Sequence, residues 1–236
     1  METRLTAIAH IHSPFPEKFG IPRQSGLVES IQAEIRFEPM YRNPDVIKGI
    51  EEFSHLWLIW EFSENKREHV SLTVSPPRLG GNEKRGVFAT RSSFRPNPLG
   101  LSCVRLKGVR MDEKLGPVLL VEGADLLDGT PIYDIKPYLP YADCHPSAKG
   151  GFGEAHKEDK IPVIFPEEER TKLPEKLRET VCELLAQDPR AAYNKKENYV
   201  YGMAFDAYDI RFMVRDNCLF VQSVEERKSG DFRKIK

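Results

Sequence analysis

The chain has 236 residues, of which 40% are hydrophobic and 30% charged, so it can bury a substantial core in one large domain or two smaller ones. Its formal net charge of -1 excludes a globally basic protein. No apolar run is long enough for a signal peptide or a transmembrane helix, so we expect no membrane partner. The four cysteines lie far apart, which favours a reducing cytoplasm over a zinc ribbon or a disulfide-stapled secreted domain.

The first half of the chain predicts strands joined by short connections. Leu5 to His12 is apolar-rich, and apolar residues alternate with polar ones from Leu27 to Phe37, as in a half-buried strand. Asn43 is a candidate cap before one short helix, since proline follows it. His55 to Trp60 is almost continuously apolar, which predicts a central strand buried on both faces. Further strands are expected at 70–74, 101–109 and 118–121.

These connections are too short for helical crossovers, so an antiparallel sheet or barrel is favoured over a doubly wound α/β fold. Residues 144–160 show no periodicity, and the predicted domain limits are 1–145, a linker at 146–160, and 161–236. In the last segment Pro174 opens a helix, and an antiparallel meander follows from Tyr199 to Val224 with a turn at Asp216. A small α+β domain is expected there.

One loop is the strongest candidate for a functional site. It runs from Gly86 to Ser102 and reads GVFATRSSFRPNPLGLS. Its double-proline turn stiffens the backbone, and Arg91 and Arg95 offer fork-shaped donors suited to a carboxylate or a phosphate. A surface turn with solvated arginines is the alternative, at about even odds.

Positive charge is concentrated around this loop. From Arg78 to Arg110 there are eight Lys or Arg residues, including Lys84 and Arg85, and one acid, Glu83. Such a patch is typical of a protein that binds an anionic partner, and nucleic acid is the first choice. A solvated basic face remains the alternative.

A second cluster of charged residues follows in the chain. Asp128-Gly129 is a turn signal, and Asp134 and Lys136 would share one face of the next short strand. On its own this pattern is more often a polar turn with a surface ion pair than a site, roughly two to one.

Several chemistries are disfavoured by what the sequence lacks. His10 and His12 would share one strand face, but no third ligand is visible, so we expect no metal site. Ser92 lies in no Gly-x-Ser-x-Gly elbow, which argues against a serine hydrolase, and neither a Rossmann fingerprint nor a P-loop occurs. The remaining residues suit a zwitterionic cofactor bound beside a polyanion.

At this point a family resemblance becomes specific. The chain resembles the TsaA-like tRNA methyltransferases, the TrmO family, over nearly its whole length. The motifs that carry the resemblance are Ile21-Pro-Arg-Gln24, Phe53-Ser-His-Leu-Trp57, Pro77-Arg-Leu-Gly-Gly-Asn82, Gly86-Val-Phe-Ala-Thr-Arg-Ser-Ser-Phe-Arg-Pro-Asn-Pro98, Asp128-Gly-Thr-Pro131, Asp134-Ile-Lys-Pro-Tyr138, Leu185-Ala-Gln-Asp-Pro-Arg190 and Tyr201-Gly-Met203. The last two resemble the extra domain of the bacterial members.

The resemblance implies a mainly β protein, with a small antiparallel β-barrel N-terminal domain and a smaller α+β C-terminal domain. It implies a cytoplasmic homodimer that uses S-adenosylmethionine to methylate N6 of N6-threonylcarbamoyladenosine beside the anticodon of a tRNA. The implied cofactor contacts are Arg23, Gln24, Ser25, Ser63, Glu64, Arg91, Leu101, Glu122, Gly123, Ala124 and Asp125. Family members commonly carry His after the buried strand, where this chain has Ser63 and Glu64.

Roles in catalysis follow from residue type and motif position. Asp134 is the expected base and Lys136 would stabilise charge on the ureido oxygen, because a urea nitrogen is a poor nucleophile. Tyr138 would stack on the nucleobase of the RNA. The RNA substrate is expected to contact Arg95, Asn97, Lys84 and Arg85. The competing hypothesis is a noncatalytic RNA-binding module whose cofactor pocket has decayed.

Overall fold

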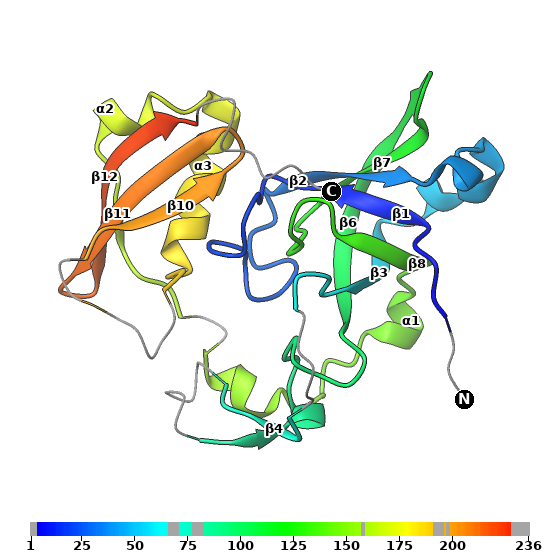
Figure 1. Ribbon diagram of the computed structural model, residues 1–236, viewed down its shortest axis with the longest axis horizontal. Helices are drawn as coiled ribbons and strands as arrows, with labels where there is room; N and C mark the ends of the chain where they lie inside the picture. The colour runs from blue at the N-terminus through cyan, green and yellow to red at the C-terminus, as the bar shows by residue number, and fades with distance from the viewer. Residues whose placement is uncertain are drawn as a thin grey trace.

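Two units lie side by side in the computed structural model of the chain (Figure 1). The structure describes residues 4–65, 71–76, 83–156, 159–190, 196 and 199–227. The predicted motif at 77–82, with Arg78, and part of the strand expected at 70–74 lie outside these residues. Within the described ranges no helix is long and apolar enough to cross a membrane.

The first unit is a closed barrel of six strands, which confirms the antiparallel β-barrel that the family resemblance implied. Around the ring the strands are β1 (Ala9–His12), β2 (Gln32–Phe37), β7 (Gly116–Glu122), β6 (Leu99–Asp112), β3 (His55–Glu61) and β8 (Pro131–Pro137). Every neighbouring pair is antiparallel. Closure leaves no free sheet edge, so the backbone hydrogen bonds of this sheet are satisfied within it.

Strand β3 corrects one expectation. Its side chains alternate in burial: Leu56, Leu58 and Trp60 fill the barrel core, while Trp57 and Ile59 point outward and stay half-exposed. The prediction that this strand is buried on both faces is therefore wrong. A barrel strand has only one face toward the core, and here the outward positions happen to be apolar as well.

Between the strands the chain forms short irregular elements. The helix expected after Asn43 is instead two 3-10 turns, Pro44–Ile47 and Ile50–Glu52, separated by Gly49 with a left-handed φ of 84°. The predicted cap is confirmed, since the Asn43 side chain accepts from the Asp45 amide at 3.0 Å. The remaining short elements are the 3-10 turns Pro39–Tyr41, Val87–Ala89 and Gly151–His156, the helix α1 (Pro140–Asp143), and the two-stranded pair β4 (Thr73–Val74) and β5 (Arg85–Gly86).

The second unit is the expected small α+β fold. Its sheet has the order β10 (Tyr201–Phe205), β11 (Tyr208–Arg215), β12 (Cys218–Glu226) and β9 (Val163–Ile164), with α2 (Glu167–Arg170) and α3 (Glu175–Ala186) packed beside it. Pro174 directly precedes α3, as expected for the residue that opens this helix. Asp216 and Asn217 both take left-handed φ angles, which a tight turn between twisted strands requires.

The second hydrophobic core draws residues from the first half of the chain. Phe15, Val28 and Ile31, each almost fully buried, pack with α3 and the β10–β12 sheet rather than with the barrel interior. Strand β2 therefore starts only at Gln32, and the predicted strand from Leu27 is shorter than expected. The domain limits at 145 and 160 remain a prediction, and the two units share one stretch of chain.

Candidate active site

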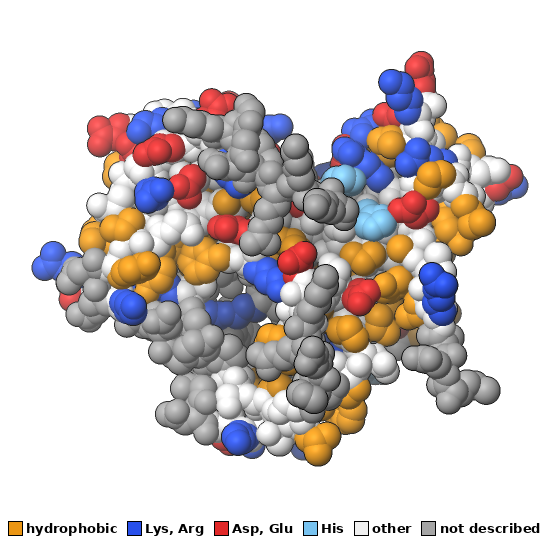
Figure 2. Space-filling model, in the orientation of Figure 1, with side chains coloured by type: hydrophobic (Ala, Val, Ile, Leu, Met, Phe, Trp, Pro, Cys, Tyr) orange, Lys and Arg blue, Asp and Glu red, His pale blue; other side chains and the backbone are white. Residues whose placement is uncertain are grey.

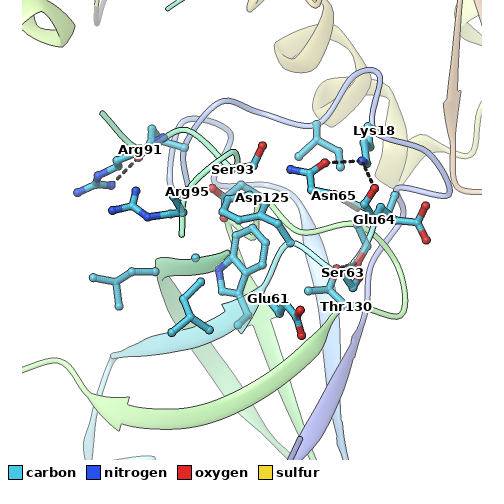
Figure 3. Close-up of a pocket in the computed structure, with 18 of the residues that line it drawn as sticks. Lys18, Glu61, Ser63, Glu64, Asn65, Arg91, Ser93, Arg95, Asp125 and Thr130 are labelled. Carbon is cyan, nitrogen blue, oxygen red and sulfur yellow. Dashed lines mark hydrogen bonds between the residues drawn. The ribbon is translucent and has the colours of Figure 1, made fainter. Parts of the chain in front are cut away.

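A cavity of about 750 Å³ opens at one end of the barrel. Its walls come from the loop between β1 and β2, the end of β3, the loop before β6, and the turn after β7. In Figure 3, Arg91 and Arg95 lie on one side of the cavity, Lys18, Glu64 and Asn65 lie on the opposite side, and Asp125 lies between them. The volume falls in the range of about 300–1,000 Å³ that is usual for small-molecule sites.

The loop before β6 is held in shape by its own hydroxyl groups. Thr90 Oγ1 donates to the Val87 carbonyl at 2.9 Å and accepts from the Ser92 amide at 3.3 Å. Ser92 Oγ in turn accepts from the Phe94 amide at 3.2 Å. These hydroxyls stabilise turns. The arginines of the same loop are thereby presented to the cavity from a fixed backbone.

The β1–β2 loop, which supplies one wall of the cavity, is held in place by the second unit. Phe15 makes an edge contact with Phe205 at 5.6 Å between ring centroids, and Phe19 stacks near Phe212 at 6.3 Å. Arg23 Nη2 donates to the Asp188 carbonyl at 3.1 Å. The apolar side chains of the β1–β2 loop are thus buried in the second core, while Lys18, Arg23 and Gln24 of the same loop line the cavity.

Asp125 is the acidic group at the base of the cavity. Trp60 Nε1 donates to Ser102 Oγ at 2.9 Å, and that hydroxyl donates to Asp125 Oδ1 at 2.6 Å. Burial raises the pKa of the Asp125 carboxyl, although hydrogen bonds from Ser102 and from the Ser25 backbone, with the charge of Arg91, oppose the rise. The carboxylate is therefore fixed in orientation but costly to ionise until a cationic or hydrogen-bonding ligand arrives.

Arg91 and Gln24 meet across the cavity mouth. Arg91 Nη1 donates to Gln24 Oε1, which joins the loop before β6 to the β1–β2 loop. On the far side, Lys18 Nζ donates to Asn65 Oδ1 at 2.9 Å and to the Glu64 carbonyl at 3.2 Å. Hydrogen bonds thus link the loops on both sides of the opening (Figure 3).

The structure brings most of the predicted cofactor residues together. Those that line the cavity are Arg23, Gln24, Ser63, Glu64, Arg91, Leu101 and Asp125. Ser25 lies beside Asp125, and its Oγ also accepts from the Cys103 amide at 3.1 Å. Glu122, Gly123 and Ala124 are not among the lining residues: Glu122 points outward to Lys107, Gly123 bonds backbone groups of Gly26 and Ile31, and Ala124 is buried in the barrel core.

Of the four residues predicted to contact RNA, two line the cavity and two do not. Arg95 and Asn97 line the cavity, and Arg95 Nη1 donates to the Thr90 carbonyl at 3.2 Å. Lys84 and Arg85 do not line it, and Arg85 pairs with Glu83 at 2.6 Å. A role for Lys84 and Arg85 in RNA binding stays a prediction.

The predicted catalytic residues do not line the cavity. Lys136 Nζ and Asp134 Oδ2 form an exposed ion pair at 2.8 Å on the outer face of β8. Asp134 lies opposite Ile59, which lies opposite Leu101 at the cavity rim. Two strand spacings separate the aspartate from the rim, roughly 10 Å. Tyr138 lies further along, against His55 and Trp57.

Sequence reasoning missed several residues of the cavity. Lys18 lies in a proline-rich loop with no pattern to mark it, and Trp60 looked like ordinary core. Phe88 is 78% exposed although it is a large aromatic residue and lines the cavity. Its place within the Gly86 to Ser102 motif is the one signal that could have found it. No group of three or more potential metal ligands occurs among the described residues, and His10 and His12 contact Glu38 and Asp128.

Replacing Asp125 by asparagine is expected to stabilise the protein at neutral pH. Because burial raises the folded-state pKa, this carboxyl favours folding while protonated, and that contribution is lost as the pH rises through the folded pKa. Asn keeps the oxygen that accepts from Ser102 but carries no charge. The melting temperature of the variant should exceed that of the wild type by a margin that grows from pH 4 to pH 8. A constant difference would contradict the assignment.

Comparisons with known proteins agree with this geometry. The model of the tRNA-methyltransferase O N-terminal domain matches residues 10–144, and that of the TrmO C-terminal domain matches 158–227. The tRNA (adenine(37)-N6)-methyltransferase of Escherichia coli strain K12 is 41% identical over 229 residues, covering 93% of this chain and 97% of that protein. A putative S-adenosylmethionine-dependent methyltransferase, RcsF, of Pseudomonas aeruginosa is 42% identical over 204 residues, 84% of this chain and 86% of its own length.

A solved structure supports the same conclusion. The crystal structure of TrmO from Pseudomonas aeruginosa superposes with a TM-score of 0.75 at 32% identity, covering 95% of this chain and 100% of that one. Both the barrel with its cavity and the second unit are thus accounted for by one family. The chain belongs to the TrmO family.

Proposed function

We propose that this protein transfers the methyl group of S-adenosylmethionine to N6 of an adenosine next to the anticodon of a tRNA. The acceptor is the N6-threonylcarbamoyl form of that adenosine. The observation that carries the proposal is the cavity in which Arg91, Gln24 and the buried Asp125 converge, in a chain of this family. The named activities of the relatives support the reaction type.

The side chains of the cavity suit S-adenosylmethionine. Arg91 carries a guanidinium suited to the amino-acid carboxylate of this cofactor, and Asp125 offers a fixed carboxylate to its hydroxyl or cationic groups. When bound, the cofactor supplies a methyl group on a sulfonium. The contribution of the protein is to hold the acceptor nitrogen in line and to exclude water.

The base that receives the acceptor proton remains a prediction. Asp134 lies on the outer barrel face roughly 10 Å from Leu101, with Lys136 beside it, so the pair would meet a substrate that extends over the rim. Methyl transfer would form the bond from N6 to the methyl carbon as the S–CH3 bond of the sulfonium breaks and leaves a neutral thioether. The N6 proton would be released to Asp134, while Lys136 would screen charge on the ureido oxygen. Tyr138 directly follows β8 and would contact the adenine ring of the substrate.

We also infer that the protein acts as a homodimer in the cytoplasm. Trp57, Ile59 and Leu101 form a half-exposed apolar stripe on the outer face of β3 and β6. Leu101 borders the cavity as well, so a second copy packed on this stripe would border the site and shield it from water. Analytical ultracentrifugation of the wild type measures this state directly.

Replacing Arg91 by alanine is expected to weaken S-adenosylmethionine binding by about 1.5–3 kcal/mol, the usual cost of losing a charge-assisted hydrogen bond. Isothermal titration of the folded variant measures it. Arg85→Ala is the matched control, because Arg85 is an arginine of the same region that does not line the cavity. Unchanged affinity in Arg91→Ala would remove this residue from the site.

The reaction itself is tested by methyl transfer to tRNA. The purified protein should methylate tRNA that carries N6-threonylcarbamoyladenosine, and mass spectrometry of the anticodon-loop nucleosides should show one added methyl group. A wild-type protein that binds this tRNA but not S-adenosylmethionine would instead support the noncatalytic RNA-binding module.

A further inference from the structure

A second groove runs between the outer face of the barrel and the second unit. It has a volume of about 610 Å³. Arg36 on β2 and Lys107 and Arg110 on β6 line it from the barrel, and Lys176 on α3 lines it from the other side. Figure 2 shows blue side chains gathered beside the pale-blue histidines, over the region where Figure 1 labels β7. None of these four cations lines the cavity at the end of the barrel.

The cations project above a recessed carboxylate. Glu34 accepts from Arg36 Nη2 at 2.8 Å and pairs with Arg110 Nη1 at 2.7 Å. Its side chain is 25% exposed, against 36% for Arg36 and 46% for Arg110. Burial alone would raise the pKa of Glu34, but the two guanidinium groups hold it below its ordinary value, so Glu34 is ionised at neutral pH.

A similar cluster of one acid and two cations lies beside the groove, which only its Lys107 lines. Glu122, with only 13% of its side chain exposed, lies 3.3 Å from Lys107 Nζ and 3.9 Å from Arg105 Nη1. Lys107 and Arg105 are each about half-exposed. Each acid therefore neutralises one of its two cations. Among the residues that line the groove, the four cations outnumber the two acids, the recessed Glu34 and the exposed Asp206, so positive charge is in excess there.

We propose that this groove binds the sugar–phosphate backbone of the RNA substrate, away from the base that is methylated. An approaching polyanion meets the exposed cations before the recessed acids, and guanidinium groups match phosphate oxygens in geometry. Glu34 on β2 and Glu122 on β7 are offset by two residues on neighbouring strands, so their backbone positions lie roughly 8 Å apart. Successive phosphates of one strand could thus be held. The inference rests on the proposed function, because it takes RNA as the substrate.

The test compares two double variants. Lys107→Gln with Arg110→Gln removes one cation from each acid and leaves Arg105 and Arg36 to pair with them. Arg211→Gln with Arg215→Gln is the control, since these exposed arginines of β11 line neither the cavity nor the groove. Melting temperatures confirm that both variants are folded.

Binding of a full-length tRNA transcript is measured at several KCl concentrations. For the groove variant we expect affinity to fall at least tenfold at low salt. The slope of log affinity against log salt should become shallower by about 1.4 to 1.8, because each lost phosphate contact removes roughly 0.7–0.9. The control variant should match the wild type. Affinity for S-adenosylmethionine should be retained in both.

Two results would overturn the proposal. One is a groove variant whose tRNA affinity and salt slope match the wild type. The other is a variant that loses binding of poly-L-glutamate but keeps tRNA binding, which would assign the groove to an acidic protein. Failure of the proposed function looks different: wild-type protein would bind tRNA with the expected salt slope yet add no methyl group to it.

Discussion

Replacing Gly100 by alanine is expected to lower the free energy of unfolding by about 1–3 kcal/mol, the usual cost of overpacking a core. A Cβ at this position would lie 2.2 Å from Trp60 Cε2, inside van der Waals contact. Gly100 faces Trp60 directly across the β3–β6 pair, and Trp60 is only 6% exposed, so the indole cannot swing out to solvent.

The same substitution should also weaken S-adenosylmethionine binding, at least tenfold. A displaced Trp60 loses its hydrogen bond to Ser102, and Ser102 then no longer orients Asp125 in the cavity. Chemical denaturation and isothermal titration measure the two effects. Gly86→Ala is the matched control: this glycine begins the same motif, its φ is -56°, and a Cβ there meets no atom within 4 Å. Equal behaviour of the two variants would remove the indole from the site.

Much of the barrel could be predicted because its strands follow local rules. Alternation of apolar and polar residues marked β2, and the short connections excluded helical crossovers. The error on β3 arose because Trp57 and Ile59 are apolar on the outer face, and periodicity alone cannot say whether a helix, a second sheet or a second molecule covers them. The 3-10 turns after Asn43 keep helical spacing, but Gly49 interrupts them.

The site was predictable where residues of one sequence motif line the cavity. Arg91, Arg95 and Asn97 lie in one stiff loop, so their convergence follows from local backbone. Long-range placement could not be derived in this way. Nothing in the segment from Pro14 to Gly26 reveals that its apolar side chains leave the barrel for another core, because both cores accept Phe and Ile equally.

The position of the predicted catalytic residues relative to the cavity was harder to predict, for a related reason. Asp134 and Lys136 lie two residues apart on one strand face, as predicted, and they do meet each other. The sequence could not decide whether that face lines the cavity or lies outside it, since a barrel strand offers both. The bulge in the β3–β8 pairing between Ile59 and Trp60 shifts the register at this point. Their role in methyl transfer therefore stays a prediction.

Replacing Phe205 by alanine is expected to lower the free energy of unfolding by about 3–5 kcal/mol, as for other buried aromatic residues. Phe205 is 1% exposed and packs edge-on against Phe15 of the β1–β2 loop. The adjacent Asp206 amide also donates to the Pro14 carbonyl at 2.7 Å. Loss of the ring should therefore release the loop that carries Arg23 and Gln24, and S-adenosylmethionine affinity should fall even in the folded fraction.

Stability and cofactor binding can be separated by a control in the same core. Leu219→Ala, on β12 and two strands away from β10, empties an equally buried position and should cost about 2–5 kcal/mol. Both variants are titrated well below their melting temperatures, with Phe205→Leu as a milder form in case the alanine variant does not fold. If the loop is held by the second unit, cofactor affinity falls in the Phe205 variants and is kept in Leu219→Ala. Equal losses in the two would mean that the second unit acts on the cavity only through global stability.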